Sequence, residues 1–115
     1  MITLYGISNC DTVKKARAWL DEHGVEYRFH DFKKQGVPTE RLTHWLRDPG
    51  WDALLNRKGT TWRRLHEDER AAATEQAGAE ALMLAHPSLI KRPVVEWGSG
   101  ISVGFSAEDW SERAK

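Results

Sequence analysis

The sequence Ile2-Thr3-Leu4-Tyr5-Gly6-Ile7-Ser8-Asn9-Cys10 decides the fold. Its first half is a short β-prone run closed by a glycine, and its second half is a polar turn that leads to Cys10. From Asp11 onward, apolar residues recur at helical spacing until Gly24 supplies a stop signal. We therefore predict a strand, a turn and then a helix from about Cys10 to about His23.

A second strand is predicted immediately after this helix. Val25–Phe32 alternates apolar and polar residues, which is typical of a half-buried strand. A strand, a helix and a strand in this order form a βαβ unit, whose two strands are parallel with a right-handed crossover. The polar segment Lys33–Pro38 is expected to end the unit.

The middle of the chain, at about residues 38–86, is predicted to be a helical insert. We expect Thr39 to cap a helix that Asp48-Pro49-Gly50 breaks, and Trp51–Leu55 to form a second helical piece. Two more helices are expected between about Asp68 and His86. Between these parts, the basic segment Lys58–Arg64 is interpreted as a solvated loop, with contact to an acidic partner as the alternative.

The last third of the chain is predicted to be a β-hairpin followed by a helix. Val94–Trp97 and Ile101–Phe105 flank the glycine-containing turn Gly98-Ser99-Gly100. Ser106 is then expected to cap a helix over Ala107–Ala114. The predicted order is βαβ, a helical insert, ββ and α, which we interpret as a single α/β domain over residues 1–115.

Composition narrows the classes of function. The chain has 17 Lys plus Arg and 17 Asp plus Glu, so its net charge is zero and does not favour nucleic-acid binding. The single cysteine excludes an internal disulfide and suits a reducing compartment. With no targeting segment and no apolar run long enough to span a membrane, we expect a cytoplasmic protein without membrane contact.

The five histidines do not show the spacing of metal ligands, so no metal site is predicted. The six tryptophans are interpreted as core anchors rather than a stacking surface.

Cys10 is the candidate reactive group. A lone cysteine is by default a small buried hydrophobic residue. At a helix start, however, unpaired N–H groups and the positive end of the helix dipole stabilise a thiolate. Lys14 and Lys15 lie about one turn further along and could lower the pKa of the thiol, although such lysines are also typical of a solvated helix face.

Arg92 and Pro93 stand immediately before the predicted hairpin. In the simpler interpretation, Pro93 begins the strand and Arg92 is a surface charge. In the functional interpretation, Arg92 presents a planar set of donors to an oxyanion or carboxylate bound at the thiol.

Three local patterns resemble the arsenate reductase (ArsC)/Spx/YffB family, and most closely its YffB-type branch. They are Gly6-Ile7-Ser8-Asn9-Cys10-Asp11-Thr12-Val13-Lys14-Lys15-Ala16, Ala53-Leu54-Leu55-Asn56 and Arg92-Pro93. The resemblance implies a thioredoxin-like fold with a mixed sheet, in which Cys10 is the nucleophile. It also implies a cis peptide bond before Pro93 and an anion-binding role for Arg92. We expect Asn9 to lie beside the thiolate and to contribute to substrate or anion binding.

The chain departs from the family pattern at two of three arginine positions that surround the oxyanion in arsenate reductases. Asn56 fills one position, with Arg57 directly after it, and Gly104 fills the other. We expect Asn56 and Arg57 to contribute to substrate or anion binding.

The Spx branch carries a Cys-x-x-Cys switch, but here Val13 takes the place of its second cysteine. A thiolate that has attacked a disulfide must then be released by an outside thiol, so glutathione is expected as co-substrate, and a glutaredoxin as a possible partner. Our main hypothesis is a monomeric, glutathione-dependent thiol-disulfide oxidoreductase without a bound cofactor. The alternatives are an arsenate reductase coupled to glutathione or glutaredoxin, and a non-enzymatic, Spx-like binder of a transcription component.

Overall fold

The computed structural model describes all residues from 1 to 115. The chain divides into two compact units, one made of Met1–Gly36 with Arg92–Lys115 and the other of Val37–Lys91. The second unit corresponds to the helical insert that we predicted at about 38–86, and it extends further, to Lys91. None of the helices has the length and apolar character that crossing a membrane requires.

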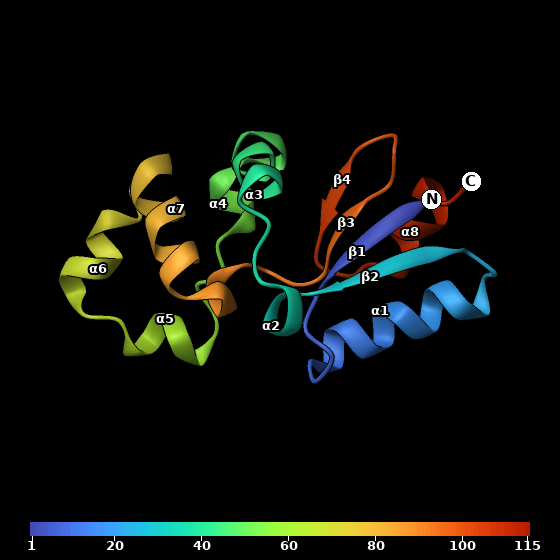
Figure 1. The fold of residues 1–115 in the computed structure, drawn as a ribbon, viewed down its shortest axis with the longest axis horizontal. Helices are drawn as coiled ribbons and strands as arrows, with labels where there is room; N and C mark the ends of the chain where they lie inside the picture. Colours follow the sequence, from blue (N-terminus) through green and yellow to red (C-terminus); the bar gives the residue numbers. More distant parts are fainter. The chain divides into compact units, whose positions relative to one another are not determined.

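The first unit contains a four-stranded mixed sheet (Figure 1). Its strand order is β2-β1-β3-β4, with β1 at Ile2–Gly6, β2 at Tyr27–Asp31, β3 at Val94–Glu96 and β4 at Ile101–Val103. β1 pairs parallel with β2 and antiparallel with β3, and β3 pairs antiparallel with β4. The predicted parallel βαβ unit and the predicted hairpin are thus confirmed.

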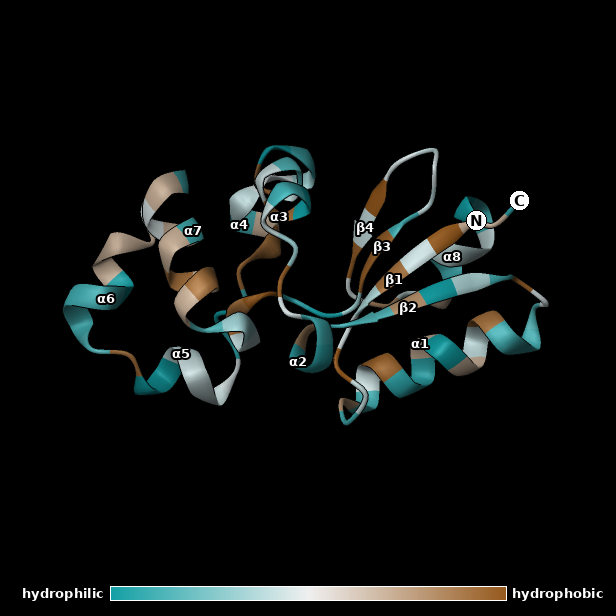
Figure 2. Ribbon diagram, in the orientation of Figure 1, coloured by the Kyte–Doolittle hydropathy of each residue, from teal (hydrophilic) through white to brown (hydrophobic).

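Helices α1 (Asp11–Glu22) and α8 (Ala107–Arg113) contribute to one core with the sheet. Leu4 and Val95 are neighbours across β1 and β3 and belong to this core. At its centre is the fully buried Trp110 of α8, whose ring lies edge-on to Trp19, Trp97 and Phe105, at centroid distances of 5.7, 5.1 and 4.8 Å. The alternation of brown and teal along α1 in Figure 2 corresponds to its buried and exposed faces.

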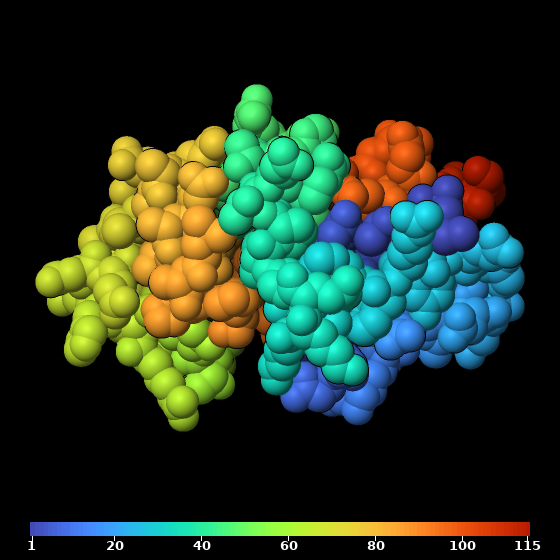
Figure 3. Space-filling view, in the orientation of Figure 1, coloured from blue at the N-terminus to red at the C-terminus, as the bar shows by residue number.

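The bounds of α1 agree with the prediction to within one residue at each end, because Cys10 is its N-cap and His23 its C-cap. On the face shown in Figure 3, the side chains of α1 lie beside those of β2. Arg17 joins the two elements, since its Nε donates to the Tyr27 hydroxyl at 2.9 Å and its guanidinium lies 4.1 Å from the centre of the Phe29 ring.

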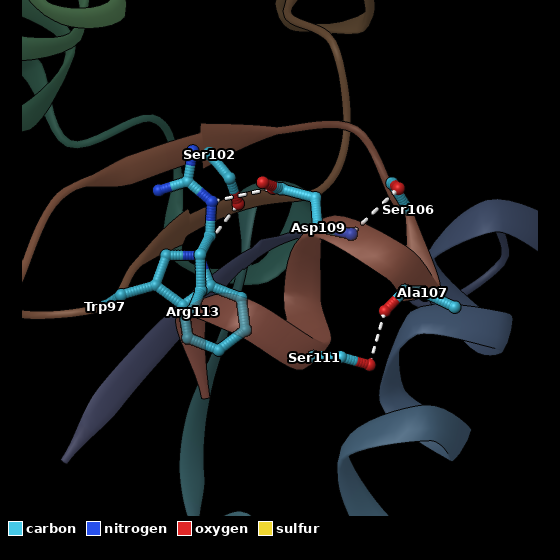
Figure 4. A network of polar contacts seen from close by, with 7 residues as sticks. All are labelled: Trp97, Ser102, Ser106, Ala107, Asp109, Ser111 and Arg113. Carbon is cyan, nitrogen blue, oxygen red and sulfur yellow. Dashed lines mark hydrogen bonds and ion pairs between the residues drawn. The ribbon is translucent and has the colours of Figure 1, made fainter. Parts of the chain in front are cut away.

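Polar contacts stabilise α8 and the hairpin internally (Figure 4). Ser106 caps α8 as predicted, with its hydroxyl oxygen accepting from the Asp109 amide at 3.2 Å. Arg113 forms an ion pair with Asp109 one turn away, at 2.7 Å. In the hairpin, the buried Trp97 Nε1–H donates to the Ser102 hydroxyl at 2.8 Å. This last bond satisfies a donor that would otherwise be buried without a partner.

The second unit is built from short helices. They are α3 (Thr39–Trp45), α4 (Trp51–Leu54), α5 (Thr60–Arg64), α6 (Glu67–Ala72) and α7 (Gln76–Ala85), with the helical turns η1 (Leu46–Gly50) and η2 (Pro87–Leu89). The predicted break before α4 is confirmed, because Asp48 has an extended backbone with φ −146° and ψ 110°. The unit buries Leu42, Trp45, Leu54, Leu55, Met83, Leu89 and Ile90.

Two local predictions were wrong, and one short helix was not predicted. Thr39 does not cap α3, because Pro38 is its N-cap and no side chain bonds there. The segment Lys33–Pro38 follows the end of β2, as predicted, but it overlaps the short helix α2 (Phe32–Gln35), which Asp31 caps by accepting from the Lys33 amide at 2.9 Å. Lys58–Arg64 is also not a loop, because α5 occupies most of it. Helices of four or five residues are too short for a helical repeat to show in the sequence.

The tryptophans mostly anchor the cores, as predicted. Trp19, Trp45, Trp97 and Trp110 are buried, whereas Trp51 and Trp62 are half-buried in the second unit.

Candidate active site

Cys10 lies at the junction between β1 and α1. Its backbone is extended, with φ −102° and ψ 126°, and its carbonyl accepts the first hydrogen bond of α1 from the Lys14 amide at 2.9 Å. The side chain is half-buried against the edge of the first unit's core. The sulfur is therefore held by a helix start while remaining partly open to solvent.

The surroundings of the thiol favour its ionised form. Burial of the sulfur raises the pKa of Cys10, but the Val13 amide, the hydrogen bond and positive charge of Arg92, and the Thr12 amide together outweigh burial, so the pKa lies below its usual range. Both amides belong to the first turn of α1, where backbone N–H groups have no partner within the helix. A lower pKa increases the fraction of thiolate, which is the nucleophilic form of a cysteine.

Sheet topology explains why Arg92 is at the thiol. β1 ends where the antiparallel β3 begins, since Tyr5 pairs with Val94. The turn that follows β1 and the residues that precede β3 therefore lie at the same end of the sheet. The Arg92–Pro93 peptide bond is cis, and Pro93 is buried with its carbonyl accepting from the Gly104 amide at 2.9 Å.

The other residues expected near the thiolate have different surroundings. Asn9 is exposed in the turn before Cys10, and Lys14 and Lys15 are exposed on α1. The side chain that hydrogen-bonds the thiol is Arg92. Sequence spacing placed a lysine beside Cys10 but could not show that the sheet brings an arginine from the far end of the chain to the same place.

Asn56 and Arg57 belong to the second unit, and their own contacts are local. Asn56 Oδ1 accepts from the Lys58 amide at 3.1 Å. Arg57 forms an ion pair with Asp52 at 2.7 Å, and its guanidinium lies 5.9 Å from the Trp51 ring centre and 5.8 Å from the Trp62 ring centre. The structure thus brings Cys10, Arg92 and Pro93 together in the first unit, and it gives Arg57 a separate set of partners.

Gly104 has a backbone that explains why no arginine stands there. The sequence analysis placed Gly104 within the second strand of the hairpin, but the residue follows the end of β4. Its φ is +84°. Side chains with a β-carbon are strained in this left-handed region.

No three His, Cys, Asp or Glu side chains of the molecule lie together as a possible metal site.

Comparison with known proteins identifies the family. The model of the ArsC family matches residues 5–113. A solved YffB protein is 49% identical, with a TM-score of 0.94 and full coverage of both chains. An arsenate reductase (ArsC) related protein from Brucella melitensis is also 49% identical, with a TM-score of 0.77 over 99% of this chain and 94% of that chain. The global transcriptional regulator Spx of Listeria innocua is 26% identical over 95% of this chain and 83% of its own length.

These likenesses confirm the resemblance and the fold class predicted from the sequence. The fold is α/β and thioredoxin-like, of the kind found in arsenate reductase-like thiol oxidoreductases. The chain belongs to the ArsC family.

Proposed function

We propose that the protein is a thiol-disulfide oxidoreductase that uses Cys10 as its nucleophile and glutathione as its co-substrate. The observation that carries the proposal is the Cys10 thiol at the N-cap of α1, at the end of the sheet where Arg92 precedes β3 and lowers the pKa of the thiol. A lowered pKa increases the fraction of thiolate at neutral pH, and the thiolate is the attacking species in disulfide exchange.

The reaction has two exchange steps. The Cys10 thiolate first attacks the glutathione sulfur of a mixed disulfide between glutathione and a substrate thiol. A bond forms between Cys10 Sγ and that sulfur, the original S–S bond breaks, and the substrate leaves as a thiolate that takes a proton from water. A second glutathione thiolate then attacks the glutathione on Cys10, which releases the Cys10 thiolate and glutathione disulfide. The substrate disulfide is reduced and glutathione is oxidised.

The need for an outside thiol follows from the composition of the chain. Cys10 is its sole cysteine, and Val13, at the position of a second cysteine in a Cys-x-x-Cys motif, is fully buried. No group of the chain can displace a partner from Cys10 by disulfide exchange. Glutathione or the thiol of a glutaredoxin supplies this step, and no bound cofactor is required.

Arg92 has two roles in this scheme. Its positive charge stabilises the Cys10 thiolate both as the attacking group and as the group released at the end. Its planar set of donors also suits a carboxylate of glutathione.

Mass spectrometry after exposure to oxidised glutathione tests the proposal. We expect one glutathionyl group on Cys10, its removal by reduced glutathione, and no addition to the Cys10→Ser variant. An unmodified Cys10 across about pH 6 to 9 would overturn the proposal, because the thiolate fraction rises throughout this range. Capture of one stoichiometric protein by both the wild type and Cys10→Ser would favour the partner-binding hypothesis instead.

Arsenate is a second candidate substrate. Two observations favour it: the similarity to the ArsC-related protein of Brucella melitensis, and the position of Arg92, which could bind an oxyanion at the thiol. The backbone of Gly104 argues against it, because it disfavours an arginine at that position. Arsenate reduction coupled to glutathione and glutaredoxin, and lost in Cys10→Ser, would rank this substrate above a glutathione mixed disulfide.

A further inference from the structure

The Val13 side chain, in the first turn of α1, occupies the space that a side chain at Gly6, the end of β1, would need. A β-carbon on Gly6 would lie 2.8 Å from Val13 Cγ2 and 3.5 Å from Cγ1. Carbon atoms that are not bonded pack at about 3.5 to 4.0 Å. Only glycine therefore allows β1 and α1 to approach each other this closely.

Neither side of this contact can yield easily. Gly6 is in register with Asp31 of β2, and the preceding Tyr5 pairs with Val94 of β3, so the strand is held on both sides. Val13 is fully buried in the core, and its β-branched side chain has essentially one favourable χ1 rotamer in a helix. Added volume at position 6 must therefore be accommodated by movement of the start of α1.

Cys10 and Arg92 are attached to opposite sides of the contact. Cys10 is the N-cap of α1 and moves with the helix, together with the amides of Thr12 and Val13. Arg92 precedes β3, which is paired with β1 and stays with the sheet. Moving α1 away from β1 therefore separates Cys10 from Arg92 while leaving the thiol's contacts within α1 unchanged.

We propose that the contact between Gly6 and the Val13 side chain is a positioning device that holds the Cys10 thiol against the Arg92 guanidinium. Gly6 and Val13 act by fixing the position of α1 and do not touch a substrate, so they are positioning residues. The inference rests on the proposed function, since it explains what holds the reactive Cys10 thiol close to Arg92.

The first test is Gly6→Ala, followed by the rate of Cys10 alkylation with iodoacetamide as a function of pH. We expect the pKa of Cys10 to rise, so that alkylation at neutral pH is about threefold slower while the rate at high pH, where the thiol is fully ionised, is unchanged. Gly24→Ala is the matched control. Its φ of +65° makes alanine strained there, but no atom lies within 4 Å of an added β-carbon, so the alkylation profile should stay that of the wild type.

The second test is rescue by the partner residue. In Gly6→Ala/Val13→Ala, the nearest remaining Val13 side-chain position is the β-carbon, at the ordinary contact distance of 3.8 Å. We expect this double variant to recover the wild-type alkylation profile although it loses core volume and unfolds more easily than the wild type. General destabilisation would instead leave the double variant no better than Gly6→Ala. A wild-type profile in Gly6→Ala, or no recovery in the double variant, would overturn the inference.

If Gly6→Ala does not fold, Val13→Ile enlarges the same contact from the helix side. We expect alkylation at neutral pH to be slower in Val13→Ile than in the wild type, and a wild-type profile would refute the positioning role. Alkylation needs no glutathione. Failure of the glutathione reaction with a normal alkylation profile would therefore count against the proposed function and leave the positioning role intact.

Discussion

Polar contacts of the first unit at Trp97 and at Cys10 differ in their exposure to water from the ion pair of Arg57 in the second unit. In the first unit, Trp97 and Ser102 share a buried hydrogen bond, and Arg92 is half-buried beside the Cys10 thiol. In the second unit, the Arg57 side chain is 39% exposed and its ion-pair partner Asp52 is 76% exposed. Water screens the second kind of contact, whereas a buried or half-buried group depends on its one partner.

This difference teaches that an arginine close to an anion in the fold is not enough to define a reactive site. Arg92 changes the ionisation of the group it contacts. Arg57 lies near an exposed carboxylate and two tryptophan rings, and its side chain remains partly open to solvent. Four predictions test the contrast.

The largest effect is expected at the buried hydrogen bond of the hairpin. Ser102→Ala leaves the Trp97 N–H buried without an acceptor and should lower the free energy of unfolding by about 1–3 kcal/mol. Denaturant unfolding followed by tryptophan fluorescence measures this loss. The control is Ser111→Ala on the exposed face of α8, for which a change within about 0.5 kcal/mol is expected. Equal losses of unfolding free energy in Ser102→Ala and Ser111→Ala would contradict the expected difference between buried and exposed hydrogen bonds.

The next effect is expected at Arg92. Arg92→Ala removes a hydrogen bond and a positive charge from the thiol, so the pKa of Cys10 should rise and alkylation at neutral pH should slow by about tenfold. Arg92→Lys keeps a positive charge but lacks the planar set of donors, so its alkylation rate at neutral pH should lie between those of the wild type and Arg92→Ala. A wild-type rate in Arg92→Ala would show that the amides of α1 alone activate the thiol.

A smaller effect is the pH dependence of stability contributed by Cys10. Its pKa is lowered in the folded protein, so its stabilising contribution is complete above the unfolded pKa of about 8.5 and is lost as the pH falls through the folded pKa. The stability of the wild type relative to Cys10→Ser should therefore increase as the pH rises through this window. Denaturation midpoints at several pH values measure the difference, and a difference that is constant with pH contradicts the assignment.

The smallest effect is expected at the surface ion pair of the second unit. Arg57→Ala should change the free energy of unfolding by less than about 1 kcal/mol, because the Asp52 carboxylate is largely exposed and the Arg57 side chain is partly exposed, so water screens the pair. It should also leave the alkylation profile of Cys10 unchanged. A loss of glutathionylation with normal alkylation would instead assign Arg57 a role in binding the substrate.

Much of the first unit could be predicted from the sequence because its signals are local. The alternation in Val25–Phe32 indicated β2, the glycine turn indicated the hairpin, and Ser106 indicated the start of α8. The short helices α2 and α5 were missed, since four or five residues carry almost no periodicity. Thr39 was also misassigned, because Pro38 occupies the N-cap position and Thr39 is already the first residue of the helix.

The sequence by itself determined that the chain has one cysteine, that a helix starts there, and that Val13 offers no second thiol. Only the tertiary structure decided which positive charge meets that cysteine. Lys14 and Lys15 are near Cys10 in the chain, but Arg92 reaches it because β3 runs antiparallel beside β1. The closeness of Gly6 to Val13 is likewise a product of packing. Local periodicity specifies secondary structure, whereas contacts between distant segments depend on how strands pair and helices pack, which no short stretch of sequence encodes.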